Sequence, residues 1–133
     1  MPFVDAIDHS HRRITVATTV DLTLEDIAAI LDLRSGNRHR YAVLIDTSEG
    51  PLPTLTPEKI RHIVDRVTEV VHRQGPRGPT AIVAPDNAIF GMGRMFETLC
   101  DLAGIPNVRV FRNRIEAEQW LEQEPSVHDL NRA

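Results

Sequence analysis

Several features that mark particular classes of protein are absent or rare in this chain of 133 residues. Cys100 is the single cysteine, so no disulfide can form within the chain and nothing indicates an oxidising compartment. No apolar run approaches the ~20 residues that a membrane-spanning helix needs, which argues against stable membrane insertion. The first residues include acidic side chains and no long apolar stretch, unlike a signal peptide, so we expect a cytoplasmic protein.

A basic surface and nucleotide-binding loops are missing too. The net charge is −4, whereas a domain that grips nucleic-acid phosphates usually presents a basic face, so we predict no nucleic-acid partner. The glycine patterns of phosphate- and dinucleotide-binding loops do not occur, and we predict no cofactor. With 41% apolar residues, the length suits one domain around one hydrophobic core.

The first third of the chain predicts a hairpin, a helix and a buried strand. β-Branched residues at 3–7 and 14–20 predict two strands joined by a polar turn. Thr23 is a candidate N-cap for a helix that ends near Arg34. Residues 41–45 form a continuous apolar run, which is typical of a strand covered on both faces.

Strands and helices alternate in the remainder. Thr56 followed by proline is a strong helix start, and Gly75 is a helix stop. A strand at 80–84 leads into a helix at 87–103 with Gly104 as its C-cap. The pattern then predicts a strand at 108–111 and a last helix.

The last helix has both a start signal and apolar anchors. Asn113 and Glu116 make a plausible capping arrangement, and Ile115, Trp120 and Leu121 are expected to hold the helix against the sheet. Residues 124–133 are predicted to be a polar tail.

The order of these elements predicts an α/β domain over residues 1–123. We expect a mixed five-stranded sheet, formed by the N-terminal hairpin and three strand-helix units and covered by about four helices. The hairpin places residues 3–7 at a sheet edge, where pairing with a second copy could form a homodimer.

Three segments carry a resemblance to a known family: YAVLIDTS at 41–48, AIVAPDNAIFGMGRMFETL at 81–99 and VRVFRNRIEAEQWL at 108–121. On these residues the chain resembles STAS-type domains, the fold of bacterial anti-sigma-factor antagonists. It resembles more closely the STAS-like group related to Sec14-type lipid-binding domains. We therefore expect a non-enzymatic regulatory domain that binds a partner protein. The alternatives are a carrier or sensor of a small apolar or lipid-like ligand and, less favoured, an enzyme.

The resemblance raises the question of a phosphorylation switch. Anti-sigma-factor antagonists carry an Asp-Ser-Ser-Gly-like motif at the helix after the third strand, where a serine is phosphorylated to control partner binding. In this chain the region reads PLPTLTPEKI, with Thr54 and Thr56 and no Ser-Gly. Thr56 is a candidate phosphosite, because phosphate at a helix N-terminus is favourable, although an N-cap explains it more economically.

Polar residues at the ends of two predicted strands form one candidate patch for a ligand or partner. Asp46, Thr47 and Ser48 follow the apolar run at 41–45, and Asp86 precedes the helix at 87–103. Open α/β sheets bind ligands at the carboxyl ends of their strands. The same residue types also make the local hydrogen bonds of turns, so both interpretations stay open.

The helix at 87–103 extends this patch. Helical spacing predicts that its sheet-facing residues are Ile89, Met92, Phe96, Leu99 and Ala103. Phe90 and Arg94 would then be surface neighbours. Gly91 and Gly93 each cost ~1 kcal/mol relative to alanine, which indicates close packing on a neighbour. Alternatively, Phe90, Gly91, Arg94 and Met95 border a partner surface or the mouth of an apolar pocket, with the helix N-terminus attracting an anionic head group.

The first turn contains residue types used in metal sites and in catalysis. His9 and His11, with Asp8 and His39, meet only part of the need of a structural zinc site for four well-placed ligands, so no metal is predicted. Asp8, Ser10 and His11 are triad residue types, but neighbours in one turn do not normally reach triad geometry. We therefore predict no catalytic residue.

Overall fold

The computed structural model describes residues 3–18, 25, 29–30, 34, 38–48, 56–75 and 77–123. The strands of this part of the chain are β1 (Phe3–Asp8), β2 (Arg13–Thr18), β3 (Ala42–Asp46), β4 (Thr80–Val83) and β5 (Val108–Phe111). Its helices are α2 (Pro57–Gln74), α3 (Asn87–Leu102) and α4 (Arg114–Gln123).

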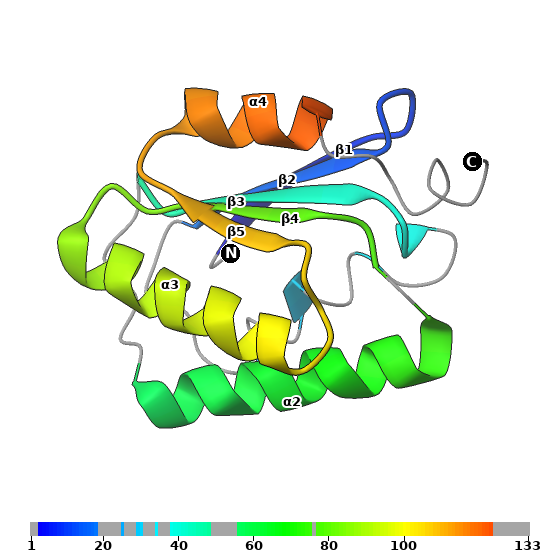
Figure 1. Cartoon of the computed structure of the whole chain (residues 1–133). Coiled ribbons are helices and arrows are strands. Elements are labelled where there is room, and N and C mark those ends of the chain that lie inside the picture. Colours follow the sequence, from blue (N-terminus) through cyan, green and yellow to red (C-terminus); the bar gives the residue numbers. More distant parts are fainter. Residues whose placement is uncertain are drawn as a thin grey trace.

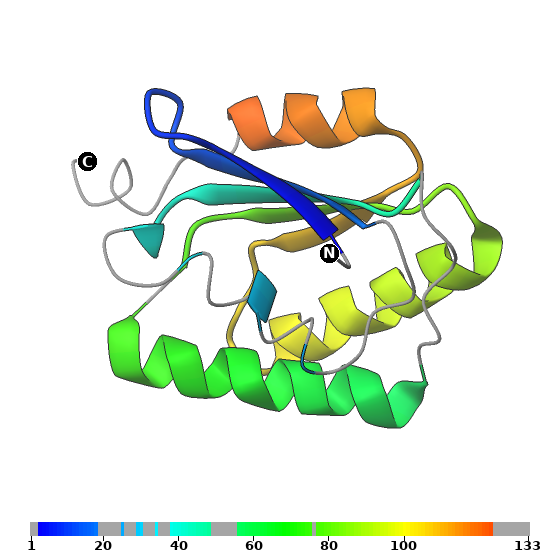
Figure 2. The same cartoon turned by 180° about the vertical axis from the view of Figure 1, so that it is seen from behind.

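The strands form one sheet in the order β1-β2-β3-β4-β5. β1 pairs antiparallel with β2, and the other neighbours pair in parallel. Helices α2 and α3 cover one face of the sheet, and α4 covers the other (Figure 1). The predicted mixed five-stranded α/β fold is therefore confirmed. β1 is an edge strand, as the view from behind also shows (Figure 2), while the homodimer stays a prediction.

β3 is covered on both faces, as its apolar run predicts. Leu44 packs with residues of β4 and α4, including Ala81 and Leu121. Its neighbour Val43 packs with Ile14 and other buried residues in a separate cluster. Successive side chains of a strand point to opposite faces, which explains why two adjacent residues belong to two cores.

Local signals place the ends of α2 correctly. The Thr56 hydroxyl accepts a hydrogen bond from the Lys59 backbone N–H at 3.2 Å, and Pro57 takes the first helical position. Gly75 has a φ of 87°, a left-handed conformation that glycine adopts without strain, and its N–H donates to the Val71 carbonyl. The helix buries Ile60, Val64 and Val67.

The predicted inward stripe of α3 is confirmed except at its last residue. Ile89 is buried, Phe96 and Leu99 pack against the core, and Met92 lines the pocket between the helix and the sheet. Gly93 and Cys100 are buried as well. The helix ends at Leu102, so Ala103 is an exposed C-cap, and its prediction as a sheet-facing residue is wrong. Gly104, expected as the C-cap, takes a φ of 85° one residue later.

One of the predicted anchors of α4 is also wrong. Asn113 caps the helix as predicted, accepting a hydrogen bond from the Glu116 backbone N–H at 2.9 Å. Ala117 and Leu121 are the buried residues, whereas Ile115 is 69% exposed. Position 115 lies about 200° around the helix from position 117, which turns its side chain away from the sheet.

Some predictions lie outside the described residues. These are Thr54, the polar tail at 124–133 and most of the helix predicted at 23–34, of which residues 25, 29 and 30 are helical. Among the helices that the structure does describe, none combines the length and apolar character needed to cross a membrane.

Candidate functional site

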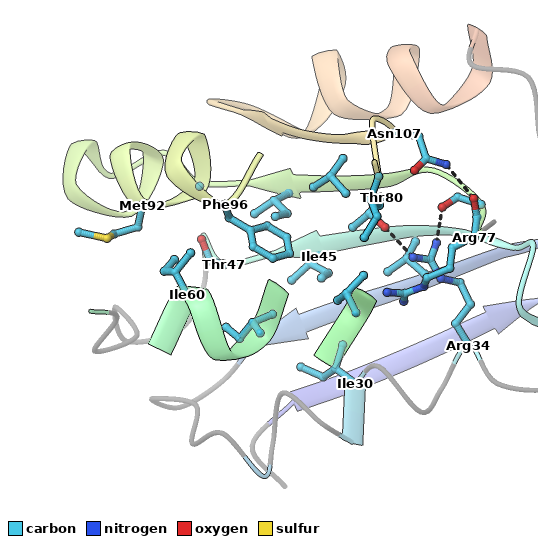
Figure 3. A pocket seen from close by; sticks show the side chains of 18 of the residues that line it. Ile30, Arg34, Ile45, Thr47, Ile60, Arg77, Thr80, Met92, Phe96 and Asn107 are labelled. Carbon is cyan, nitrogen blue, oxygen red and sulfur yellow. Dashed lines mark hydrogen bonds between the residues drawn. The ribbon is translucent and has the colours of Figure 1, made fainter. Parts of the chain in front are cut away.

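An apolar pocket of about 140 Å³ lies between the sheet and helices α2 and α3 (Figure 3). Strands β3 and β4 contribute Ile45 and Ile82 to its lining, α2 contributes Ile60, and α3 contributes Met92 and Phe96. Most of these large side chains are only half-buried. Protein interiors normally pack with few voids, so a cavity of this size is a distinct feature of the fold.

Arg34 occupies one end of this pocket as a structural group. It is 2% exposed. Its Nη1 donates to the carbonyl oxygens of Tyr41 and Gly78, both at 2.9 Å, and its Nη2 donates to Thr80 Oγ1 at 2.7 Å. These bonds tie the segment before β4 to the start of β3.

Arg77 lies beside Arg34 and has no such partners in the described part of the chain. It is 7% exposed, and Figure 3 shows its side chain reaching into the pocket next to Arg34. No hydrogen bond or ion pair of its guanidinium is found among the described residues, and Nε of each arginine is buried without a partner. Burial lowers the pKa of Arg77 to about 10, so the group stays charged at neutral pH.

The arginines also act on each other. Burial lowers the pKa of Arg34 well below its usual value, and the positive charge of Arg77 lowers it further. Two like charges at one end of an apolar pocket repel in a medium that screens them poorly. Burial of the Arg77 guanidinium beside Arg34 therefore lowers the stability of the folded protein.

Neither polar neighbour of this pair supplies a negative charge. Burial raises the pKa of the Cys100 thiol to about 12 despite the opposing effect of Arg77, so the thiol is neutral. His39 Nε2 donates to the Gly75 carbonyl at 2.6 Å, which leaves Nδ1 buried and unpartnered. Burial lowers the pKa of His39, and the nearby arginines lower it further.

The remaining polar groups of the lining are used within the protein. Thr47 Oγ1 donates to the Val83 carbonyl at 2.8 Å, and Thr80 Oγ1 accepts from Arg34. Asn107 Nδ2 donates to the backbone carbonyl of Arg77 at 2.7 Å, which positions that residue. None of the described lining residues is acidic.

The residues predicted after β3 make mostly local contacts. Asp46 Oδ1 accepts hydrogen bonds from the backbone and the hydroxyl of Ser48, and Asp46 Oδ2 lies 3.5 Å from Arg114 Nη1. Ser48 is exposed. Thr47 alone among the predicted patch residues lines the pocket.

Asp86 already occupies the N-terminus of α3. Its Oδ2 accepts hydrogen bonds from the backbone N–H groups of Ala88 at 2.9 Å and Ile89 at 3.2 Å. These are the donors that an anionic head group would use at this helix end. The N-terminus of α3 is therefore capped by the chain itself.

The α3 residues of the predicted patch lie outside the pocket. The ring of Phe90 is covered by the guanidinium of Arg112 at 4.1 Å, and Arg94 Nη1 lies 3.6 Å from Glu97 Oε1. That Phe90 and Arg94 are surface neighbours stays a prediction. Gly91 is exposed and Met95 half-buried. As a surface for a protein partner, these residues stay a prediction, as does phosphorylation of Thr56.

The hairpin turn contains triad residue types in the wrong arrangement. His11 Nδ1 lies 2.7 Å from Asp8 Oδ2 and 3.2 Å from Ser10 Oγ, so one ring nitrogen faces both partners. A catalytic triad needs the acid and the nucleophile on opposite nitrogens. His9 bonds the Tyr41 hydroxyl instead, and no group of three or more metal-ligating side chains occurs in the part of the chain that is described.

Sequence reasoning missed Arg34 and Arg77. In the sequence, Arg77 lies in the Gly-Pro-Arg-Gly-Pro segment that begins at the predicted helix stop Gly75, and no motif marks it as a functional residue. A weak signal was present in Gly78, where a Cβ would lie 2.3 Å from the Arg40 carbonyl oxygen. This close backbone approach holds the segment beside the start of β3.

No protein-family model matches the chain, and no curated protein matches it. The STAS-like membership expected from the three sequence segments therefore stays a prediction. The α/β architecture is established independently of it by the strand order and pairing.

Proposed function

We propose that this protein binds a small, largely apolar molecule in the pocket between the sheet and helices α2 and α3. The proposal is carried by the pocket itself, about 140 Å³ of space lined mainly by isoleucine, valine, methionine and phenylalanine side chains. A dry apolar cavity of ~150 Å³ takes up a molecule the size of benzene. A single ring or a short branched chain therefore fits.

The chemistry of the lining favours binding over catalysis. Thr47, Thr80 and Asn107 are engaged in hydrogen bonds within the protein, so they are not poised to activate a substrate. The resemblance to the STAS-like group related to Sec14-type lipid-binding domains supports the same function. Binding of a partner protein, the first expectation from that resemblance, stays a prediction.

Filling the pocket tests the proposal. We expect benzyl alcohol and hexanol to raise the thermal midpoint of the wild type, since a ligand that binds only the folded state stabilises it. Ile45→Phe places extra volume in the pocket and should abolish the shift. Ile115→Phe adds the same side chain at an exposed position of α4 and should leave the shift unchanged. Equal shifts in the wild type and Ile45→Phe would contradict binding at this site.

A further inference from the structure

Arg77 is a buried cation without a counterion among the residues that the structure describes. Its side chain is more than nine-tenths buried and reaches into the pocket, yet its guanidinium has no hydrogen bond or ion pair among the described residues. Charged groups inside proteins are normally paired, because desolvation of an isolated charge is costly. A group that departs from this rule inside a cavity points to a partner that is not part of the chain.

Arg34, at the same end of the pocket, is a buried arginine whose guanidinium does have hydrogen-bond partners. Its terminal nitrogens donate to backbone carbonyls and to Thr80, so its role in joining β3 and β4 accounts for it. Arg77 has no comparable structural role for its side chain. Within the described part of the chain, the one hydrogen bond of this residue is made by its backbone carbonyl, which accepts from Asn107.

The position of Arg77 is fixed before any ligand arrives. Asn107 holds its backbone carbonyl, and the next residue, Gly78, packs directly on the carbonyl groups of Arg40 and Tyr41. A guanidinium on a rigid segment loses little conformational freedom on binding, which favours affinity.

We infer that the ligand of this pocket is a carboxylate with an apolar group, whose two oxygens pair with the guanidinium of Arg77. This inference rests on the proposed function. The planar fork of an arginine matches a carboxylate in a bidentate pair. The positive charge of Arg34 adds to the attraction, and the apolar group extends toward Ile45, Met92 and Phe96.

A carboxylate fits the available donors better than a phosphate does. Among the described residues, Nε of Arg77 and Nε of Arg34 are buried without a partner, and the terminal nitrogens of Arg77 make no hydrogen bond. A carboxylate presents two oxygens on a single charge, whereas a phosphate monoester presents three oxygens and a charge of about −1.5 to −2. Thr47, Thr80 and Asn107 of the lining are engaged in hydrogen bonds within the protein, so the additional oxygen would be left unpaired.

Matched acids and alcohols separate this inference from the proposed function. Calorimetry at neutral pH would compare benzoate with benzyl alcohol and hexanoate with hexanol, and phenyl phosphate would serve as the phosphate probe. We expect the wild type to bind each acid at least tenfold more tightly than its alcohol. Arg77→Gln should remove this preference while leaving the alcohols bound, and Arg94→Gln, at an exposed arginine, should keep it.

Each of the other possible results of these binding measurements would contradict one specific claim. Equal affinity for acid and alcohol would overturn the anionic ligand and leave apolar binding intact. Tighter binding of phenyl phosphate than of benzoate would overturn the carboxylate. Binding of none of the probes would overturn the proposed function and this inference with it. If Arg77→Gln does not fold, Arg77→Lys, which keeps the charge without the fork, should reduce the preference, and an unchanged preference would contradict the bidentate pair.

Discussion

Gly93 of α3 lies so close to Val110 of β5 that a Cβ at position 93 would stand 2.6 Å from Val110 Cγ2. Gly91, one position before Met92 on the same helix, has no atom within 4 Å of the place where its Cβ would be. Two glycines that look alike in the sequence therefore have different roles. One allows the helix to approach the sheet, and the other only weakens the helix.

Alanine at these two positions should change stability in opposite directions. Gly93→Ala should lower the free energy of unfolding by ~1–3 kcal/mol, because the added methyl group must displace Val110. Gly91→Ala should raise it by up to ~1 kcal/mol through helix propensity alone. Urea unfolding measures both changes. Val110→Ala should recover part of the loss in Gly93→Ala, and an additive double mutant would contradict the contact.

The two pocket arginines form a second matched pair. Arg34→Met should lower the free energy of unfolding by at least ~3 kcal/mol, since several buried acceptors, including the carbonyl of Gly78, would lose their donor. Arg77→Met removes a buried charge that has no partner among the described residues, so the ligand-free protein should be unchanged or more stable, by up to ~2 kcal/mol.

Chemical denaturation of the two variants without added ligand checks this contrast. The stability of Arg77→Met is informative because functional groups are often kept at a cost to stability. A loss in Arg77→Met as large as that in Arg34→Met would show that Arg77 has a structural partner.

The elements that could be predicted from the sequence are those set by neighbours along the chain. Thr56 and Pro57 begin α2, Gly75 ends it, and Asn113 caps α4, because each of these signals acts within one helical turn. The strand at 108–111 was predicted with its observed bounds. Ile115 was misplaced because α4 is short, and its few apolar residues allow more than one inward face.

The pocket arginines could not be predicted in this way, because their meeting depends on sheet register. Arg34 and Arg77 are far apart in the sequence, and the pairing of Val43 with Thr80 brings their segments together. Neither arginine differs in local sequence from an ordinary surface residue. They are distinguished by the burial of both side chains and by the absence of a partner for Arg77 within the part of the chain that the structure describes.

His39 predicts a dependence of stability on pH. Burial and the nearby arginines lower its pKa in the folded protein below the usual value of ~6.5, so the unfolded chain binds a proton at a higher pH than the folded one. Its contribution to stability is complete above pH ~6.5 and is lost as the pH falls toward the folded pKa, with a slope of at most ~1.4 kcal/mol per pH unit.

Urea unfolding between pH 5 and 7.5 measures this dependence. His39→Gln, which keeps an N–H for the Gly75 carbonyl, should flatten the profile in this range. His72→Gln, at an exposed position of α2, should not. Parallel profiles for the wild type and His39→Gln would contradict a neutral buried His39.

Cys100 gives a site-specific probe of the core between α2 and α3, since it is the single cysteine of the chain. It is fully buried, and a thiol pKa of about 12 leaves about one thiol in ten thousand ionised at pH 8. Labelling by iodoacetamide should therefore be more than ~1000-fold slower in native buffer than in urea, as expected for a domain of ordinary stability. A ligand that binds the folded state should slow it further. A native rate within tenfold of the denatured rate would contradict the buried position of Cys100. The free energy of opening this core would then have to be close to zero.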